Sequence, residues 1–356
     1  MGPGLLAAFY FLLAPPSSQL DQLLQAGDFE AAAGILGKQP GKAEDPQGRA
    51  ETAILLAQCY LEMRLPQKVE VALRGCPQEY HSDPRYIYCK AEALAAKGDS
   101  QAAEKLLRTL SGDAAGLQVT FRLGVLLYEK GDYAGAEEKL RGPAGGSTPD
   151  YYSCIYRARA LLGLDRPMEG LEVLRSIGGK LETSEIKYLS GRCSYALGRY
   201  EPAAADFRLA LKLDAGYIEA AFLLSESLRR AGDRVGAREA LAVFSSLQKK
   251  EQARQRQANN FSQRCRREPG NISAWVQAGN FHLGTRDTDQ ASSHAWQALQ
   301  LDPDSFPARL LLARSLRQAG RYSRAALHYR KILLREPGHS AANIELREMI
   351  RKHADK

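Results

Sequence analysis

The sequence contains a single long apolar run, Leu5–Ala14, and this run is only ten residues long. A helix needs about 20 apolar residues to span a bilayer, so the run is too short for a membrane span. The short motifs of common enzyme classes are also absent: there is no Gly-x-Gly-x-x-Gly, no Walker loop, no His-Glu-x-x-His and no Gly-x-Ser-x-Gly. These absences argue against a nucleotide-dependent enzyme, a zinc protease and an α/β-hydrolase.

The six cysteines and six histidines are scattered along the chain. No Cys-x-x-Cys occurs, and no cysteine has a histidine at zinc-finger spacing, so we expect no metal and no cofactor. Cys154 and Cys193 have no histidine nearby in the sequence that could activate a thiolate, so no catalytic residue is expected. We expect the cysteines to be small buried residues of helices, with structural disulfides as the alternative in an exported chain.

The apolar run at the N-terminus has the length of the apolar part of a secretory signal. No Lys or Arg precedes it, and Leu12-x-Ala14 before Pro15 is a poor cleavage motif. Two interpretations of residues 1–16 stay open, a signal peptide or a first helix packed on the end of the fold. The first favours export to the cell envelope, the periplasm or the medium, and the second a cytoplasmic protein.

Alanine and leucine are abundant while β-branched residues are sparse, which favours helix over strand. The net charge of +8 is uneven: residues 249–268 carry +5, residues 309–356 carry +8, and the rest carries −5. A basic C-terminal third suits nucleic acid, anionic lipid or an acidic protein, and a solvated arginine-rich surface is the alternative.

One sequence motif recurs along the chain: a helical run, then Gly-Asp or Gly-Arg, often an aromatic residue, then an alanine-rich run. It occurs at Gly27, Gly98, Gly131, Gly198, Gly232 and Gly320. From the second of these on, the spacings are 33, 67, 34 and 88 residues, so the last contains two periods and about 20 extra residues. Such a period predicts stacked helical hairpins in place of a single globular core.

Two units, 272–303 and 306–337, show the pattern most cleanly. The first has Trp275, Ala278, Gly279, Ala291, Ala295, Ala298 and Pro303, and the second has Leu312, Ala313, Leu316, Gly320, Tyr322, Ala325, Tyr329, Ile332 and Pro337. This series resembles the tetratricopeptide repeat (TPR) family. The resemblance covers nearly the whole chain from about residue 17. It implies an all-α, right-handed superhelical solenoid of eight or nine antiparallel helix hairpins.

Two repeats are degenerate, and one is too long. Arg64 and Leu164 stand where the turn glycine of units 50–83 and 150–183 should be. We divide the chain into the apolar segment 1–16, repeats over 17–244, a basic helical insertion over 245–271, two clear repeats over 272–337 and a capping helix over 338–356. The insertion has no Gly or Pro before Pro269, so it should extend the preceding helix by several turns. In the cap, we expect Ile344, Met349 and Ile350 to face inward.

The resemblance implies that the first helix of each hairpin lines a concave groove, with positions 2, 5, 9, 12 and 13 facing inward. The candidate partner-binding residues are Tyr88, Phe121, Tyr128, Tyr151, Tyr188, Arg192, Tyr195, Phe222, Arg229, Arg314 and Arg317. Aromatic residues and arginine anchor interfaces, so a peptide with apolar anchors and an acidic end would fit. The alternative is that fifth-position residues, Cys154 among them, are buried between neighbouring first helices.

The pattern therefore predicts a non-catalytic protein–protein interaction scaffold that binds a peptide or partner surface in the groove. One alternative is a basic envelope- or nucleic-acid-associated accessory protein that uses the 249–268 arm and the C-terminal helices, with a membrane surface as a partner of the basic segment. Another is a subunit of an enzyme whose catalytic chain is different. Nucleic acid is disfavoured because no aromatic stacking pattern accompanies the arginines. The identity of the partner and the oligomeric state are not predicted.

Overall fold

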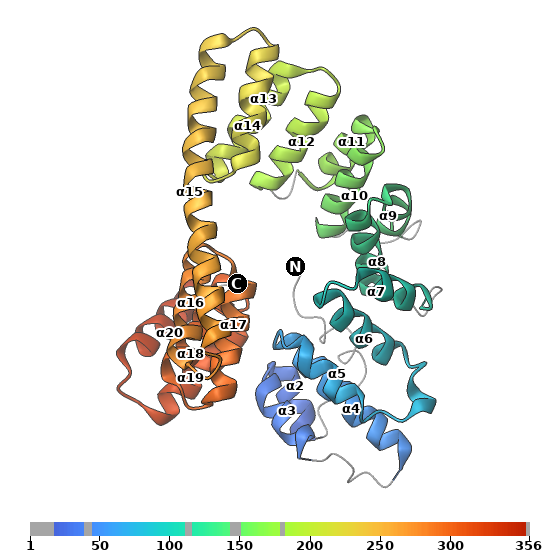
Figure 1. Cartoon of the computed structure of the whole chain (residues 1–356), viewed down its shortest axis with the longest axis vertical. Coiled ribbons are helices and arrows are strands. Elements are labelled where there is room, and N and C mark those ends of the chain that lie inside the picture. The colour runs from blue at the N-terminus through green and yellow to red at the C-terminus, as the bar shows by residue number, and fades with distance from the viewer. Residues whose placement is uncertain (1–17, 39–44, 111–115, 143–150, 179–181, 354–356) are drawn as a thin grey trace. The chain divides into compact units, whose positions relative to one another are not determined.

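The computed structural model describes residues 18–38, 45–110, 116–142, 151–178 and 182–353. Within these ranges the chain is all α-helix apart from a short 3-10 helix, η1 (Gln78–Tyr80), and the loops (Figure 1). No described helix combines the length and the apolar composition that crossing a lipid bilayer requires. The segment 1–16, with its two interpretations, lies outside the described residues.

The described helices follow one another as nine antiparallel hairpins and a final helix. The hairpins are α2 (Gln19–Ala26) with α3 (Phe29–Gly37), α4 (Pro46–Glu62) with α5 (Pro66–Leu73), α6 (Pro84–Ala96) with α7 (Ser100–Arg108), α8 (Leu117–Lys130) with α9 (Tyr133–Leu140), α10 (Tyr151–Gly163) with α11 (Pro167–Gly178), α12 (Ser184–Ala196) with α13 (Tyr200–Leu213), α14 (Ile218–Arg230) with α15 (Arg234–Arg267), α16 (Ile272–Gly284) with α17 (Thr288–Leu301), and α18 (Phe306–Gln318) with α19 (Tyr322–Arg335). The final helix is α20 (Ser340–His353). The predicted all-α hairpin fold is confirmed.

Each hairpin turns on one residue with a left-handed backbone, which we call the turn residue. The nine turn residues are Gly27, Arg64, Gly98, Gly131, Asp165, Gly198, Gly232, Arg286 and Gly320. Glycine adopts this conformation without steric cost, whereas another residue pays roughly 1–2 kcal/mol. The degenerate repeats therefore keep the turn although they have lost its glycine.

The register predicted for the fifth hairpin was wrong by one residue. The turn residue is Asp165, with φ 55°, and not Leu164. The amide of Asp165 donates to the carbonyl of Leu162, as the amide of Gly198 does to the carbonyl of Tyr195 in the next hairpin. The fifth position of this unit is consequently Ile155 and not Cys154.

The aspartate that follows a turn glycine caps the second helix. Asp28 and Asp132 accept hydrogen bonds from the amides of Ala31 (3.1 Å) and Gly135 (3.0 Å), three residues further on. Such an N-cap contributes about 1 kcal/mol, because it satisfies an amide that has no partner within the helix. The recurrent Gly-Asp motif thus ends one helix and starts the next.

The helices of a hairpin approach closely where a small residue faces a large one. A Cβ on Gly191 of α12 would lie 2.7 Å from the ring of Phe207 on α13, so no larger side chain fits there. Phe207 is completely buried as a result. The same contact recurs between Gly124 and Leu140 in the hairpin of α8 and α9.

The chain divides into two compact units. Unit 1 is Glu104–Gln255, and unit 2 comprises the described residues within Gly2–Ala103 and Arg256–Lys356. In unit 2 the first hairpins share one core with the last ones: Leu24, Phe29 and Leu36 belong to the same cluster as Trp296 and Tyr329. Nothing in the 34-residue period signals this long-range contact.

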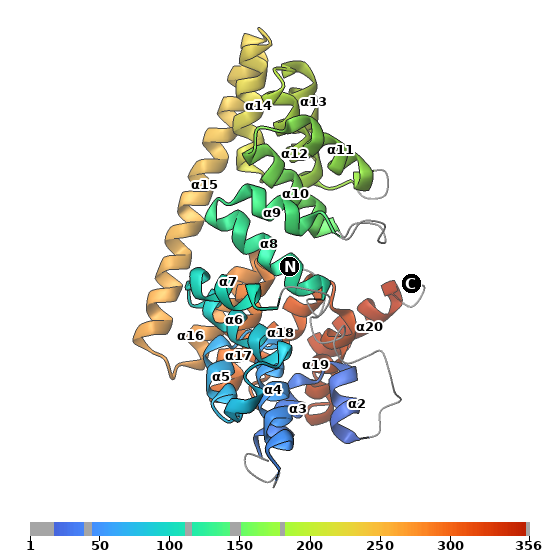
Figure 2. The same ribbon diagram turned by 90° about the vertical axis from the view of Figure 1, so that its right-hand side faces the viewer.

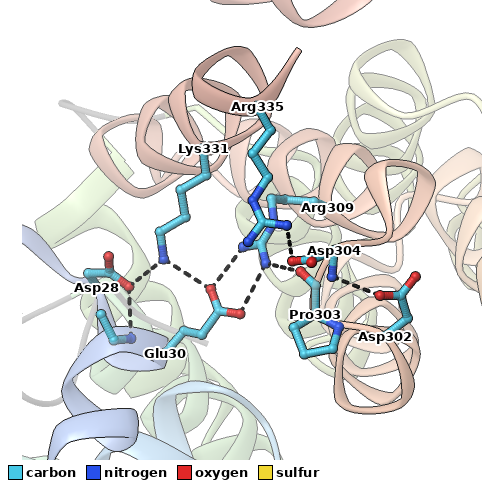
Figure 3. A network of polar contacts seen from close by, with 9 residues as sticks. Asp28, Glu30, Asp302, Pro303, Asp304, Arg309, Lys331 and Arg335 are labelled. Carbon is cyan, nitrogen blue, oxygen red and sulfur yellow. Dashed lines mark hydrogen bonds and ion pairs between the residues drawn. The ribbon is translucent and has the colours of Figure 1, made fainter.

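Ion pairs accompany this core, and we call them the chain-end contact (Figure 3). Arg309 donates to Glu30 over 2.8 Å, and Lys331 donates to Asp28 over 2.7 Å and to Glu30 over 2.9 Å. Burial alone would raise the pKa of Glu30, but Arg309 and Lys331 outweigh it and lower the pKa to about 2. The carboxylate is therefore charged and paired at neutral pH.

The inner side of the capping helix differs from the prediction. Ala342, Leu346 and Met349 of α20 are buried, whereas Ile344 and Ile350 are 57% and 48% exposed. The buried residues follow the spacing of four and three that places side chains on one helix face. The prediction was correct for Met349 and wrong for the two isoleucines.

The long helix predicted after Gly232 is α15, a single continuous helix of 34 residues (Figure 2). It continues through the polar segment and ends two residues before Pro269. The domain boundaries at residues 244, 271 and 337 stay a prediction.

Candidate functional site: the first-helix face of unit 1

Eight of the eleven candidate residues lie in unit 1, on the first helices of four consecutive hairpins, α8, α10, α12 and α14. They are Phe121, Tyr128, Tyr151, Tyr188, Arg192, Tyr195, Phe222 and Arg229. We call this surface the first-helix face. The remaining three, Tyr88, Arg314 and Arg317, belong to unit 2.

Arginine guanidinium groups lie over tyrosine rings along this face. On α12 the guanidinium of Arg192 is 5.8 Å from the ring centre of Tyr188. On α10 the guanidinium of Arg159 is 5.2 Å from the ring centre of Tyr156. These distances are within the range of a cation–π interaction, which orders both side chains.

A third pair joins two hairpins. The guanidinium of Arg230 on α14 lies 5.9 Å from the ring centre of Tyr195 on α12 and 5.7 Å from that of Tyr200 on α13. Three consecutive first helices therefore each contribute to a tyrosine–arginine pair. Such a repeated arrangement presents alternating apolar and cationic groups along the stack.

Sequence reasoning missed Tyr156, Arg159 and Arg230. Arg159 lies six residues before its turn residue, Asp165, as Arg192 lies six before Gly198, so the two arginines occupy equivalent positions. The misplaced turn at Leu164 concealed this equivalence. Aspartate adopts a left-handed backbone more readily than leucine, and this preference could have identified Asp165 as the turn residue.

Aromatic contacts hold the N-terminal part of the face. The ring of Tyr156 meets Phe121 edge-on at 5.9 Å and Tyr128 at 5.7 Å between ring centres. Tyr188 packs against Tyr217, next to the start of α14, with the ring centres 4.7 Å apart and the ring planes tilted by 32°. All of these rings are half-buried, so each is fixed on one side and open on the other.

Burial keeps four tyrosine hydroxyls on and beside the face protonated. Burial raises the pKa of Tyr151, Tyr156 and Tyr188, and it raises that of Tyr217 further. The hydroxyl of Tyr151 also shares a hydrogen bond of 3.0 Å with Thr183. At physiological pH these groups act as neutral hydrogen-bond donors and acceptors.

Some of the arginines on the face are already neutralised. Arg159 pairs with Glu185, and Arg229 pairs with Glu226 over 2.7 Å. Within the described ranges Arg192 and Arg230 have no ion-pair partner. Their positive charges remain available to a carboxylate.

Tyr88 does not belong to this surface, because its side chain is only 6% exposed. Its helix, α6, packs against both α4 and α5. This outcome matches the alternative that fifth-position residues are core residues, and we leave Tyr88 out of the candidate site.

The two C-terminal arginines are engaged within the chain. Arg314 donates to Glu345 of α20 over 2.9 Å, Arg317 lies 3.5 Å from the same carboxylate, and the hydroxyl of Tyr329 donates to it over 2.8 Å. Burial opposes ionisation of Glu345, but Arg314 prevails and lowers its pKa. The capping helix thus supplies a carboxylate beside a pocket of about 560 Å³ at the predicted basic end.

Among the described residues, no group of three or more His, Cys, Asp or Glu side chains could hold a metal ion. All six cysteines are buried, and none is joined in a disulfide. Burial raises the pKa of Cys59 to about 12 and that of Cys193 to about 11, which keeps these thiols protonated and weakly nucleophilic.

Tetratricopeptide repeat family models match residues 88–147, 157–218 and 282–346, just over half of the chain. The chain belongs to the tetratricopeptide repeat family. Proteins of this family are generally protein-interaction scaffolds that bind proteins or peptides, and they are typically non-catalytic. No curated protein matches the sequence of this TPR protein.

Solved structures resemble the TPR protein at low sequence identity. The crystal structure of MamA is 17% identical and has a TM-score of 0.42, covering 46% of this chain and 97% of that one. YrrB, described as a TPR protein with an unusual peptide-binding site, is 20% identical with a TM-score of 0.40, covering 48% and 89%. A chain of the APC/C hetero-tetramer Cut9–Hcn1 is 12% identical with a TM-score of 0.34, covering 98% and 92%.

Proposed function

We propose that this TPR protein is a non-catalytic scaffold whose first-helix face in unit 1 binds a peptide with apolar anchors and a carboxylate. The observation that carries the proposal is the series of tyrosine–arginine pairs on α10, α12 and α14. Tyrosine and arginine are enriched among the residues that dominate binding energy.

The packing of these side chains favours binding because it lowers the entropy lost on association. Tyr156, Tyr188 and Tyr195 are half-buried and held by neighbouring rings, so few rotamers remain to be fixed. Arg192 and Arg230 can each donate charge-assisted hydrogen bonds to a carboxylate. A peptide that carries an aromatic or aliphatic anchor near an acidic residue satisfies both kinds of group.

The alternative of a basic accessory protein has weaker support. Several cations of its C-terminal part form ion pairs inside the chain: Arg309 with Glu30, Arg314 with Glu345, Arg324 with Glu62 and Lys331 with Asp28. These pairs reduce the positive field that an anionic surface would meet. Binding that weakens steeply with added salt would mark this alternative.

The test is an affinity purification with mass spectrometry on the intact chain and on a variant carrying Tyr188→Ala, Arg192→Ala and Arg230→Ala. The matched control carries Arg208→Ala and Leu209→Ala, two exposed residues on the second helix α13. We expect a partner that the intact chain and the control retain and the variant loses, with unchanged circular dichroism. Retention of every partner by the variant would contradict the proposal.

A further inference from the structure

In seven of the other hairpins the second helix packs against the helix that follows it, as α13 packs against α14 and α17 against α18. In the hairpin of α14 and α15, apolar side chains at core positions of the repeat are exposed instead. In a regular repeat, the helix that follows the hairpin packs on it and buries its apolar face. Here the following helix, α16, packs instead near the far end of α15, where Phe261 and Cys265 contact Ala274 and Ala278. Phe261 and Cys265 lie 20 and 24 residues after Leu241 in the sequence.

The consequence is visible at the residue nine positions after each turn residue. In the nine hairpins these residues are Leu36, Leu73, Leu107, Leu140, Leu174, Phe207, Leu241, Ala295 and Tyr329. Eight of them are at most 4% exposed, but Leu241 is 48% exposed. A core position of the repeat is therefore open to solvent in this hairpin.

The first helix of the same hairpin shows the same departure. The residues ten positions before the turn residues are Ile54, Tyr88, Phe121, Ile155, Tyr188, Phe222, Val276 and Leu310 in the described chain. All are buried or half-buried except Phe222, which is 43% exposed. Its ring lies 5.3 Å from that of Phe244 on α15. We call Phe222, Leu241 and Phe244 the uncovered face.

Ordinary surface exposure does not account for this face. Val243 of α15 is 46% exposed, but Leu209 occupies the equivalent position on α13 and is 42% exposed. That position therefore points outward even where the next helix is present. Leu241 and Phe222 differ because their equivalents are covered.

The charge of α15 indicates what could cover the face. The part of α15 that belongs to unit 1, residues 234–255, contains five arginines and lysines against two glutamates. Lys249 and Lys250 are exposed on α15 after Leu241. An occupant that follows α15 would meet positive charge, so its solvent-facing flank should be acidic.

We propose that the uncovered face binds an amphipathic helix of another protein, which takes the place of the missing first helix and carries an acidic flank. Helix α14 shows what such a helix presents, since it packs on α13 through Ala220, Leu224 and Leu228. A stripe of small and apolar residues at this spacing fits the uncovered face.

The test uses the full chain and two synthetic helical peptides. Both carry alanine and leucine at the spacing of Ala220, Leu224 and Leu228, and the other positions are glutamate-rich in one and lysine-rich in the other. Fluorescence anisotropy should show saturable binding of the acidic peptide and at least tenfold weaker binding of its basic twin. Leu241→Gln should weaken binding of the acidic peptide at least tenfold. Leu209 on α13 is exposed to a similar extent, at 42% against 48%, and Leu209→Gln should leave the binding unchanged.

Three results would overturn the proposal: no saturable binding of the acidic peptide, equal binding of the two peptides, or binding that Leu241→Gln does not change. Sedimentation of the chain alone gives a further check, because a dimer that Leu241→Gln dissociates would assign the face to a second copy instead. Phe222 belongs to both surfaces, but Leu241 belongs only to the uncovered face and Tyr188 only to the first-helix face. Tyr188→Ala should therefore leave the affinity for the acidic peptide unchanged, which separates this proposal from the function proposed for the first-helix face.

Discussion

At the scale of single residues, the turns show how the repeat tolerates an unfavourable amino acid. Arg64, Asp165 and Arg286 adopt φ of 55–63°, a region that L-residues other than glycine rarely occupy. The helices on either side are long and packed, so they hold the backbone in place against this preference. The strain is local and should be relieved by restoring glycine.

Arg286→Gly should raise the free energy of unfolding of unit 2 by about 1 kcal/mol, because glycine adopts the left-handed backbone without a steric clash. Arg286 is exposed, so no packing is lost. The reverse change at the equivalent turn, Gly320→Arg, should lower it by about the same amount. Urea unfolding can be followed by tryptophan fluorescence, since Trp275 and Trp296, the only tryptophans, both lie in unit 2. A loss of stability in both variants would contradict the strain argument.

At the scale of the element, the hairpin is the part of the fold that the sequence specifies best. One short stretch contains glycine at the turn, aspartate at the cap and a large apolar residue nine positions after the turn. The repeat period could therefore be recognised from the sequence. The side that each first helix presents was harder to predict. Tyr88 and Tyr188 share a register position, yet one is buried and the other half-buried, because burial depends on the neighbouring hairpins and not on the residue itself.

Equivalent residues in two adjacent hairpins should respond very differently to truncation. Phe207→Ala removes a completely buried ring and should cost about 3–5 kcal/mol, whereas Leu241→Ala removes a half-exposed side chain and should change stability by about 0.5 kcal/mol or less. Thermal unfolding monitored by circular dichroism would compare the two. A large loss from Leu241→Ala would mean that this residue is covered in solution.

At the scale of the whole molecule, the sequence did not reveal which hairpins associate. The repeat period predicts that each hairpin contacts its neighbours in the sequence, but it does not predict contacts between distant repeats. Arg309 and Glu30 are 279 residues apart, and only the folded chain brings them together. The sequence likewise predicted only part of the candidate site. Because the turn of the fifth hairpin was placed one residue before Asp165, Arg159 was not recognised as equivalent to Arg192 and was left out of the predicted set.

The chain-end contact should make the stability of unit 2 depend on pH through Glu30. Its pKa of about 2 lies below the ordinary value of 4.5, so it stabilises the fold above about pH 4.5 and loses this contribution as the pH falls toward 2. Glu30→Gln should therefore lower the free energy of unfolding by about 2–3 kcal/mol at pH 7 and pH 5, and by about half as much at pH 3.

The matched control is Asp304→Asn, which breaks the pair of Asp304 with Arg335 beside the same contact (Figure 3). Both of these side chains are more than half exposed, at 60% and 57%, so solvent screens their pair and Asp304→Asn should change stability little at any of the three pH values. Tryptophan fluorescence again reports on unit 2. If Glu30→Gln behaves like Asp304→Asn, the first and last hairpins do not depend on this carboxylate. If only Glu30→Gln shows the loss and its decline with acid, the buried pair with Arg309 and Lys331 stabilises their association.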